Sequence, residues 1–413
     1  MDEKTVLQEE LVPIPKQELP LNIRIGIEQE LFFFNECTPG SAFWLPNGTI
    51  LYQKLMNFIR DEYFRRGFQE IMTPVIAKDS LWAISGHLEK YKENMFCFEC
   101  NGAGYGLSPM GCPKACLMFK HRTRTYKELP LRLADMGSLH RNEASGSLTS
   151  LFRNIKFSQD DCHIFCTFSQ IKQEIKSAIE FLSYVYKKFN FQFEVCLSTR
   201  PDQFIGTIEV WDKAEKELSE VLNDSGFKWL VKEKDGSFYG PKIDIHLTDS
   251  IGRKHQCGTI QLDFQLPQRF DLKYVDEHGE LKTPVIIHRA IYGSFERFIA
   301  ILIEHFNGKW PLWLNFRQVK VIPVSEKFLD YANYVKNELK KYKFNVDVDE
   351  SDNTIPKKVR AAQVEQYNYI LVVGQKEVDT NMVNVRYRDS DDKKMIGLAE
   401  LVTEISKNIS EFL

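Results

Sequence analysis

The spacing of hydrophobic residues predicts a chain that mixes helices and strands. Apolar side chains recur at helical intervals over residues 50–66, 170–189 and 212–222, which indicates three helices. Gly67 directly follows the first of them, where a glycine commonly caps a helix. The third is rich in Glu and Lys, so we expect its charged side to face solvent. An apolar run that begins at Cys116 predicts a further helical segment.

Alternation of apolar and polar side chains predicts strands through the first 300 residues. It is found over residues 105–110, 131–139, 157–165, 193–197, 236–246, 255–264 and 284–290. We expect residues 157–165 to form a half-buried strand that returns beside 131–139 as a hairpin. Residues 43–48 indicate a strand that enters a turn, and residues 68–74 indicate a strand that ends at a proline. Gly293 and Ser294 precede a helical pattern over residues 295–304.

The pattern changes beyond the segment 310–314, which we interpret as a domain junction. Strands then alternate with helices, the strands over 319–324, 345–349, 369–373 and 383–387 and the helices over 328–340, 355–366 and 398–409. This order predicts a small α/β domain with a mixed sheet. A dinucleotide-binding fold is not indicated, because no Gly-x-Gly-x-x-Gly follows the first strand.

Composition narrows the class of protein. A chain of 413 residues is too long for one ordinary core, and 43% hydrophobic with 27% charged residues suits a soluble globular protein. The chain contains no run of about 18 apolar residues that could span a membrane. The net charge of -3 means that a nucleic-acid partner would need local basic patches. Nine cysteines without a signal peptide indicate reduced thiols rather than a disulfide framework.

Residues 1–20 predict an extended or mobile lead-in. Three prolines lie in this segment, and it shows little apolar periodicity. Five acidic residues in the same segment argue against a mitochondrial transit peptide, so we expect a cytoplasmic protein.

The predicted hairpin carries an unusual set of polar side chains. They are two cations, two acids, an amide and a potential metal ligand: Arg141, Arg153, Glu143, Asp161, Gln159 and His163. Opposite charges on one ribbon are a poor way to build a core. They suit a charged, zwitterionic ligand, although a surface ribbon with ordinary salt bridges is the alternative.

The sequence from His140 to Ser147, together with Gln-Asp-Asp-Cys-His over 159–163, resembles motif 2 of class II aminoacyl-tRNA synthetases in its threonyl form. The resemblance covers nearly the whole chain from about residue 20. It implies an α+β catalytic core on an antiparallel sheet over 21–314. A small α/β anticodon-binding domain with a mixed sheet would follow over 318–413.

Two further segments are similar to motifs of the same family. The helix over 50–66 with the strand ending at Pro74 is similar to motif 1, which forms the homodimer interface in the family. The strand 284–290 and the helix that presents Arg297 are similar to motif 3. A guanidinium at a helix N-terminus suits a triphosphate.

The metal prediction rests on the resemblance. Met-Gly-Cys-Pro over 110–113 matches a family segment whose cysteine binds zinc, and Cys112, His163 and His288 are the implied ligands of one Zn²⁺ per chain. The chain departs from the family pattern around this segment, since Gly111, Lys114 and Ala115 replace Asn, Gly and His. Cys97, Cys100, Cys112 and Cys116 form two close pairs, which leaves a zinc ribbon as an alternative.

The resemblance also implies roles for individual residues. ATP, accompanied by Mg²⁺, would contact Arg141, Glu143, Arg153, Gln256, Thr259 and Arg297, while L-threonine would contact Gln159, Asp161, Tyr239, Lys242 and Gln261. Arg141 and Arg297 would act in catalysis. His87, in a Ser-Gly-His segment, would help to deprotonate the accepting ribose hydroxyl of tRNA(Thr). A second motif 2 arginine of the family is replaced by Ile155.

These residues imply threonine–tRNA ligase activity without an editing domain. The anticodon would be read by Arg360, Glu377 and Arg386 on the C-terminal domain. A prolyl, seryl or glycyl enzyme would share motifs 1 to 3, and only the zinc trio with Gln159 and Asp161 selects threonine. A catalytically silent relative that serves as an RNA- or protein-binding subunit is the alternative from another class.

Overall fold

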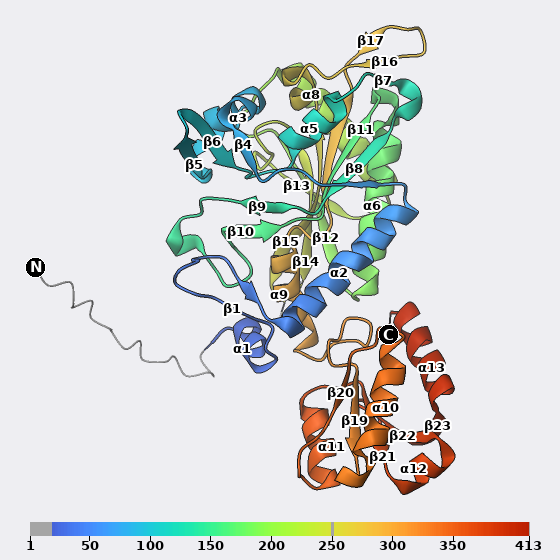
Figure 1. Cartoon of the computed structure of the whole chain (residues 1–413). Helices are drawn as coiled ribbons and strands as arrows, with labels where there is room; N and C mark the ends of the chain where they lie inside the picture. The colour runs from blue at the N-terminus through green and yellow to red at the C-terminus, as the bar shows by residue number, and fades with distance from the viewer. Residues whose placement is uncertain (1–18, 249–251, 413) are drawn as a thin grey trace, which may run out of the picture.

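The computed structural model describes residues 19–248 and 252–412, so most of the expected lead-in lies outside the described residues. Figure 1 shows a large α+β unit above a smaller α/β unit. No helix within the two described ranges has both the length and the apolar character that crossing a bilayer requires.

An eight-stranded sheet forms the centre of the large unit. Its strands follow the order β13 (Trp229–Lys232), β12 (Phe193–Ser198), β14 (Lys242–Thr248), β15 (Lys254–Asp263), β18 (Val285–Ala290), β11 (Asp161–Cys166), β8 (Leu131–Asp135) and β3 (Gln69–Ile71). All neighbours are antiparallel except the two edge pairs, which are parallel. The expected antiparallel core is therefore confirmed.

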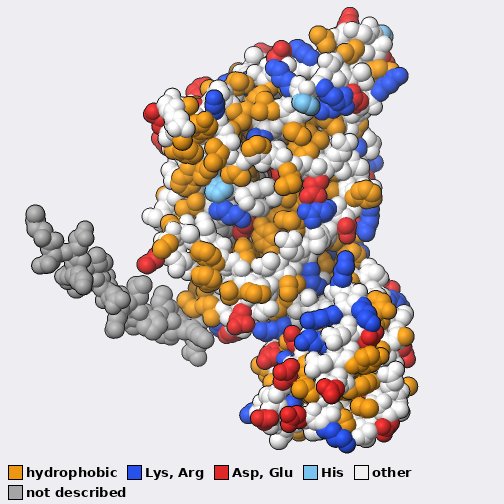
Figure 2. Space-filling model, in the orientation of Figure 1, with side chains coloured by type: hydrophobic (Ala, Val, Ile, Leu, Met, Phe, Trp, Pro, Cys, Tyr) orange, Lys and Arg blue, Asp and Glu red, His pale blue; other side chains and the backbone are white. Residues whose placement is uncertain are grey.

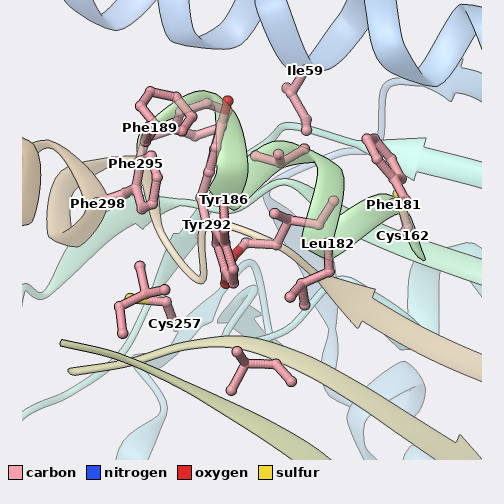
Figure 3. Close-up of a cluster of buried hydrophobic side chains, with 14 of the residues drawn as sticks. Ile59, Cys162, Phe181, Leu182, Tyr186, Phe189, Cys257, Tyr292, Phe295 and Phe298 are labelled. Atoms are coloured by element: carbon pink, nitrogen blue, oxygen red, sulfur yellow. The ribbon is translucent and has the colours of Figure 1, made fainter. Parts of the chain in front are cut away.

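Four helices cover one face of this sheet: α2 (Pro46–Arg65), α6 (Ile171–Lys188), α7 (Ile208–Asp224) and α9 (Phe295–Phe306). Figure 3 shows the aromatic centre of that layer, where Phe189, directly after α6, meets Phe298 of α9. Each such side chain, removed from water, contributes about 2 kcal/mol to folding. This layer holds the opposite face of the sheet in a fixed geometry.

The opposite face is covered only in part. A second core joins it to α3 (Asp79–Ser85), α4 (His87–Lys90), α5 (Cys112–Lys120), α8 (Gln265–Arg269) and the small sheet of β4 (Ile76–Lys78), β5 (Cys97–Cys100) and β6 (Ala103–Leu107). A ribbon of β9 (Ser138–His140) and β10 (Lys156–Ser158) extends from the sheet, and β7 (Arg124–Thr125), β16 (Tyr274–Val275) and β17 (Leu281–Lys282) form an outer sheet.

The first described helix, α1 (Leu21–Glu28), lies beside α9 at the lower end of the large unit (Figure 1). The chain then forms the short pair β1 (Phe32–Phe33) and β2 (Phe43–Trp44) before α2 begins. Packing of α1 on α9 places the N-terminal part of the described chain close to the helix of motif 3.

Two predicted boundaries and one predicted burial pattern are wrong. The expected turn up to residue 48 is the first turn of α2, because Pro46 occupies a position at a helix start that proline favours. Likewise α5 begins at Cys112 rather than Cys116, with Pro113 in its first turn. The strand Asp161–Cys166 is buried on both faces rather than half-buried, because the helical layer covers one side and the second core the other.

The small unit has the predicted mixed sheet, in the order β20 (Val346–Val348), β19 (Val319–Pro323), β21 (Tyr369–Val373), β22 (Met382–Tyr387) and β23 (Lys393–Gly397). The first three strands are parallel and the last two antiparallel. Its helices are α10 (Leu329–Lys340), α11 (Ile355–Val364), α12 (Gln375–Thr380) and α13 (Leu398–Ser410). Beyond α13, Phe412 packs against Phe58 and Trp313 of the large unit.

Candidate active site

A cavity of about 440 Å³ opens on the face of the central sheet that the four helices leave free. Every residue predicted to bind ATP, threonine or a metal lines it: Arg141, Glu143, Arg153, Gln256, Thr259, Arg297, Gln159, Asp161, Tyr239, Lys242, Gln261, Cys112, His163 and His288. These residues come from distant parts of the sequence, and the sheet brings them together.

Strand register aligns four of the lining residues in one row. Lys242 lies opposite Gln261, Gln261 opposite His288, and His288 opposite His163 on successive strands. Residues that are directly opposite on paired strands point to the same face of a sheet. Two imidazoles, an amide and an ammonium group therefore share the cavity floor.

Cys112 completes a compact cluster with the two histidines. One ligand atom from each of Cys112, His163 and His288 lies within 4.8 Å of the other two, and all three residues are buried. No other group of three or more potential metal ligands occurs within residues 19–248 and 252–412. The four-cysteine alternative is therefore not formed, since Cys97 and Cys100 are exposed on β5.

The surroundings of this cluster suit a divalent cation. His288 Nε2 lies 2.9 Å from Oδ2 of the buried Asp263, whose other oxygen accepts hydrogen bonds from the backbone N–H groups of Gln265 and Leu266. A carboxylate that accepts from one ring nitrogen leaves the other free to ligate a metal. Burial raises the pKa of the Cys112 thiol, and a bound cation would reverse that by stabilising the thiolate. Two imidazoles and a thiolate are a common zinc donor set, so these residues fit zinc.

Asp161 stands beside the cluster, with one oxygen 3.8 Å from His163 Nε2. Its carboxylate rests against Gly111, where an added Cβ would lie 2.3 Å from Asp161 Oδ2. Lys114 is buried nearby, and burial lowers its pKa. Gly111 and Lys114, which depart from the family pattern, thus contribute to the environment of Asp161.

The mouth of the cavity carries the three arginines. Arg141 lies over the ring of Phe157 at 5.0 Å and pairs with no carboxylate among the residues described. Arg153 donates two hydrogen bonds to Glu143 Oε2, at 2.9 and 2.7 Å. Arg297 donates to the carbonyl oxygens of Phe152 and Gln256. Arg141 and Arg297 are held by an aromatic ring and backbone carbonyls rather than by carboxylates, which leaves their positive charge for an anionic ligand.

The buried carboxylate of Asp244 holds polar side chains of the cavity floor in place. Asp244 is fully buried and accepts hydrogen bonds from Gln256 Nε2 at 2.7 Å and Ser198 Oγ at 2.8 Å. Its Oδ2 also lies 2.8 Å from Lys242 Nζ. Gln261 Nε2 donates to the carbonyl oxygen of Gly240. These contacts fix Lys242, Gln256 and Gln261 without a ligand.

His87 is not among the residues that line the cavity in this structure, so its expected role in transfer to tRNA stays a prediction. Its side chain is fully buried, with Nδ1 2.8 Å from Ser85 Oγ and Nε2 3.3 Å from Met110 Sδ. Burial lowers its pKa to about 4. The side chain of Met110, which does line the cavity, rests on it.

Sequence reasoning missed several lining residues. Phe152 stacks on His255, and Phe157 supports Arg141. Asn154 is buried at the cavity edge and bonds the carbonyl oxygen of Ser150. No pattern in the sequence separates these side chains from ordinary core residues, because their role depends on how the tertiary structure places residues 152–157 beside the cavity.

The comparisons with known proteins agree with this geometry. A family described as tRNA synthetase class II core domain (G, H, P, S and T) matches residues 96–306, and an anticodon binding domain family matches residues 318–408. The chain belongs to the class II aminoacyl-tRNA synthetases.

Two curated relatives of this synthetase are named as threonine–tRNA ligases. It is 51% identical to the probable threonine–tRNA ligase 2, cytoplasmic, of Dictyostelium discoideum, over 94% of this chain and 59% of that protein. It is 55% identical to the human threonine–tRNA ligase 1, cytoplasmic, over 89% of this chain and 51% of that protein. The chain thus spans between half and three fifths of the length of these curated relatives.

A solved structure matches the synthetase over nearly its full length. The crystal structure of the RNA binding domain of threonyl-tRNA synthetase from Cryptosporidium parvum Iowa II aligns with a TM-score of 0.92 at 48% identity. The alignment covers 94% of this chain and 98% of that one.

The residues predicted to read the anticodon all lie on the small unit of the synthetase. Arg360 is exposed on α11, and Arg386 is half-buried on β22 with its Nε unpaired among the described residues. Glu377 lies in the first turn of α12, where its Oε2 accepts a hydrogen bond from the backbone N–H of Gly374. Part of the Glu377 carboxylate is therefore engaged in capping its own helix.

Proposed function

We propose that this chain activates L-threonine with ATP and transfers the threonyl group to tRNA(Thr), releasing AMP and diphosphate. The observation that carries the proposal is the Cys112, His163 and His288 cluster, which lies beside Asp161 in the same cavity as Arg141. One end of the cavity can bind a hydroxyl and an amine, and the other can bind phosphates. The names of the relatives support threonine as the amino acid.

Activation requires two anions to approach each other, because the threonine carboxylate attacks the α-phosphorus of ATP. Arg141 offers several N–H donors to both groups and neutralises the charge that would otherwise separate them. The Phe157 ring beneath its guanidinium limits the directions in which Arg141 can turn. We assign Arg141 the bridging role.

The outer phosphates would be held by Arg153 and Arg297, with the Mg²⁺ that accompanies ATP sharing their charge. Ser294 caps α9 through the backbone N–H of Arg297, so the positive end of this helix points to the same region. Glu143 would accept a hydrogen bond from the adenine amino group. Gln256 and Thr259 complete the nucleotide subsite.

Threonine would lie deeper, above the row of residues on the sheet. Gln159, Tyr239, Lys242 and Gln261 surround the place for its polar backbone groups. A bound zinc ion would supply a Lewis acid that ligates the amino nitrogen and the side-chain hydroxyl. Asp161 would accept the hydrogen bond of that hydroxyl.

Transfer would place the tRNA acceptor end in the cavity and the anticodon on the small unit. His87 contacts Met110, which lines the cavity, and its role in deprotonating the accepting ribose hydroxyl rests on the resemblance alone. Arg360, Glu377 and Arg386 would contact unstacked anticodon bases.

A homodimer through the motif 1 region completes the proposal. Phe64 at the end of α2 is 84% exposed and Met72 after β3 is 91% exposed. Large apolar side chains left in water at such levels favour an interface. Figure 2 shows further hydrophobic side chains on the large unit around β4 to β6 and α3. The names of the relatives favour a cytoplasmic location.

The test is ATP–pyrophosphate exchange run with each of the twenty amino acids. We expect exchange that depends on threonine, weaker exchange with serine and background rates with proline or glycine. Arg141→Ala should abolish exchange because the two anions are then unscreened. Exchange with proline or glycine in place of threonine, or with no amino acid at all, would overturn the proposal.

A further inference from the structure

The loop that carries Phe152 and Arg153 is attached to the rest of the molecule by partly buried hydrogen bonds. Thr149 and Arg153 form an isolated β-bridge that closes the loop. Ser150 adopts φ +46°, a conformation that side chains other than glycine rarely take. A non-glycine residue keeps such a conformation only where its surroundings hold it.

One side chain that holds Ser150 comes from α1, and Asn154 within the loop donates a further hydrogen bond to the Ser150 carbonyl oxygen. Asn22 is 1% exposed and accepts a hydrogen bond from Ser150 Oγ at 2.5 Å through its Oδ1. Its Nδ2 donates to Oε1 of Glu304 on α9 at 2.6 Å. Glu304 is itself buried and paired with Arg253. A single amide thus connects the loop to the helix of motif 3.

Helix α9 contacts the loop at a second point. Arg297 Nε donates to the carbonyl oxygen of Phe152 at 3.1 Å. Arg297 and Glu304 are seven residues apart, so they lie on the same side of α9 and about 10 Å from each other along it. The loop is thus attached to α9 at two points. Arg297 belongs to the nucleotide site, whereas Glu304 lies outside the cavity.

We propose that Asn22 is a positioning residue for the ATP site. By joining Ser150 to Glu304 it fixes the loop so that Phe152 and Arg153 face the nucleotide before ATP arrives. Threonine binds on the sheet floor, which this contact does not touch. The inference rests on the proposed function only for the assignment of this end of the cavity to ATP.

The experiment measures binding of Mg²⁺–ATP to the purified chain by calorimetry, without threonine. Asn22→Ala and Ser150→Ala should each weaken ATP binding about fivefold to tenfold, since each removes a partly buried hydrogen bond and frees the loop. The double variant should be no weaker than either single variant, because both changes break one connection. In exchange assays the KM for ATP should rise while kcat and the KM for threonine stay within about twofold.

The matched control is Gln29→Ala. Gln29 lies at the other end of α1 and bonds Gly308 and Trp310, but not the loop. Its replacement should loosen α1 and leave ATP binding unchanged. Equal loss of ATP affinity in Gln29→Ala, or additive losses in the double variant, would overturn the proposal. If Asn22→Ala does not fold, unchanged ATP affinity in Ser150→Ala overturns it alone.

Failure of the proposed function gives a different result. In one outcome, the wild-type chain binds ATP and the variants change ATP binding as predicted, but threonine does not stimulate exchange. This outcome contradicts the assignment of threonine as the amino acid and supports the role of Asn22. In the opposite outcome, the chain activates threonine normally, but Asn22→Ala and Ser150→Ala bind ATP as tightly as the wild type. This outcome supports the proposed function and contradicts the role of Asn22.

Discussion

At the scale of single residues, the three candidate metal ligands make the sharpest prediction. Purified protein should contain close to one zinc per chain, and Cys112→Ala and His288→Ala should each lose both the zinc and threonine activation. Cys116→Ala is the matched control, because Cys116 is equally buried one turn along α5 but is no member of the cluster. Mass spectrometry of the metal content and exchange assays measure both effects. Full activity in metal-free protein would contradict the assignment.

Gly111 gives a second residue-scale prediction. An alanine there would bring a Cβ to 2.3 Å from Asp161 Oδ2, so the carboxylate must rotate away. Because Asp161 is assigned to the threonine hydroxyl, Gly111→Ala should raise the KM for threonine about tenfold, as loss of a charged hydrogen bond does. The KM for ATP should change by less than about twofold.

The control for this variant is Gly397→Ala, since the space around Gly397 is open. An unchanged KM for threonine in Gly111→Ala would show that Asp161 does not contact the substrate. The family pattern has asparagine at this position, which would require a different placement of Asp161 from the one seen here.

At the scale of elements, the sequence predicted long periodic segments well. The helix α6 and the strand β21 agree with their expected bounds to within a residue, because their apolar faces form the core. Two of the elements that the sequence did not predict are short and polar. The helix α12 and the strand β23 carry few buried side chains, so hydrophobic periodicity could not reveal them.

The candidate metal ligands were predicted from the family resemblance and not from hydrophobic periodicity. No spacing rule relates Cys112, His163 and His288, and only the family resemblance indicated them. The sequence did not predict the burial of His87, because this burial arises from tertiary packing against Trp82 and Phe238, which a local sequence motif does not report.

The β22 strand yields an element-scale prediction. Arg386→Ala should lower aminoacylation of tRNA(Thr) about tenfold or more and leave pyrophosphate exchange nearly unchanged, since only the tRNA reaches this strand. The control is Lys394→Ala on the neighbouring strand. Lys394 lies opposite Val385 and therefore points to the other face of the sheet, where it bonds Glu400. Equal losses in both assays would contradict a role for Arg386 in anticodon binding.

At the scale of the whole molecule, the two edges of the central sheet differ in what they should bind. Met72 follows the edge strand β3, whereas Leu230 lies on the opposite edge strand β13 and is 62% exposed. Met72→Glu should convert a dimer into monomers, because a charge would be buried at the interface. Leu230→Glu should leave the dimer intact. Light scattering after size-exclusion chromatography measures the mass, and a wild-type chain that is already monomeric would contradict the dimer.

We propose that the cavity selects threonine through the side-chain hydroxyl group of this amino acid. Valine has the same shape as threonine but lacks the hydroxyl. An apolar pocket separates such isosteres by only about a hundredfold, whereas a site built to bind the hydroxyl can reject valine by roughly 10⁴-fold or more. Serine keeps the hydroxyl and should be rejected far less strongly.

The most direct test is the ratio of kcat/KM for threonine to that for valine in ATP–pyrophosphate exchange. The geometry of Cys112, His163, His288 and Asp161 predicts a ratio of about 10⁴ or higher in the wild-type chain. A ratio near 10² would mean that the pocket recognises shape alone, which would contradict the account.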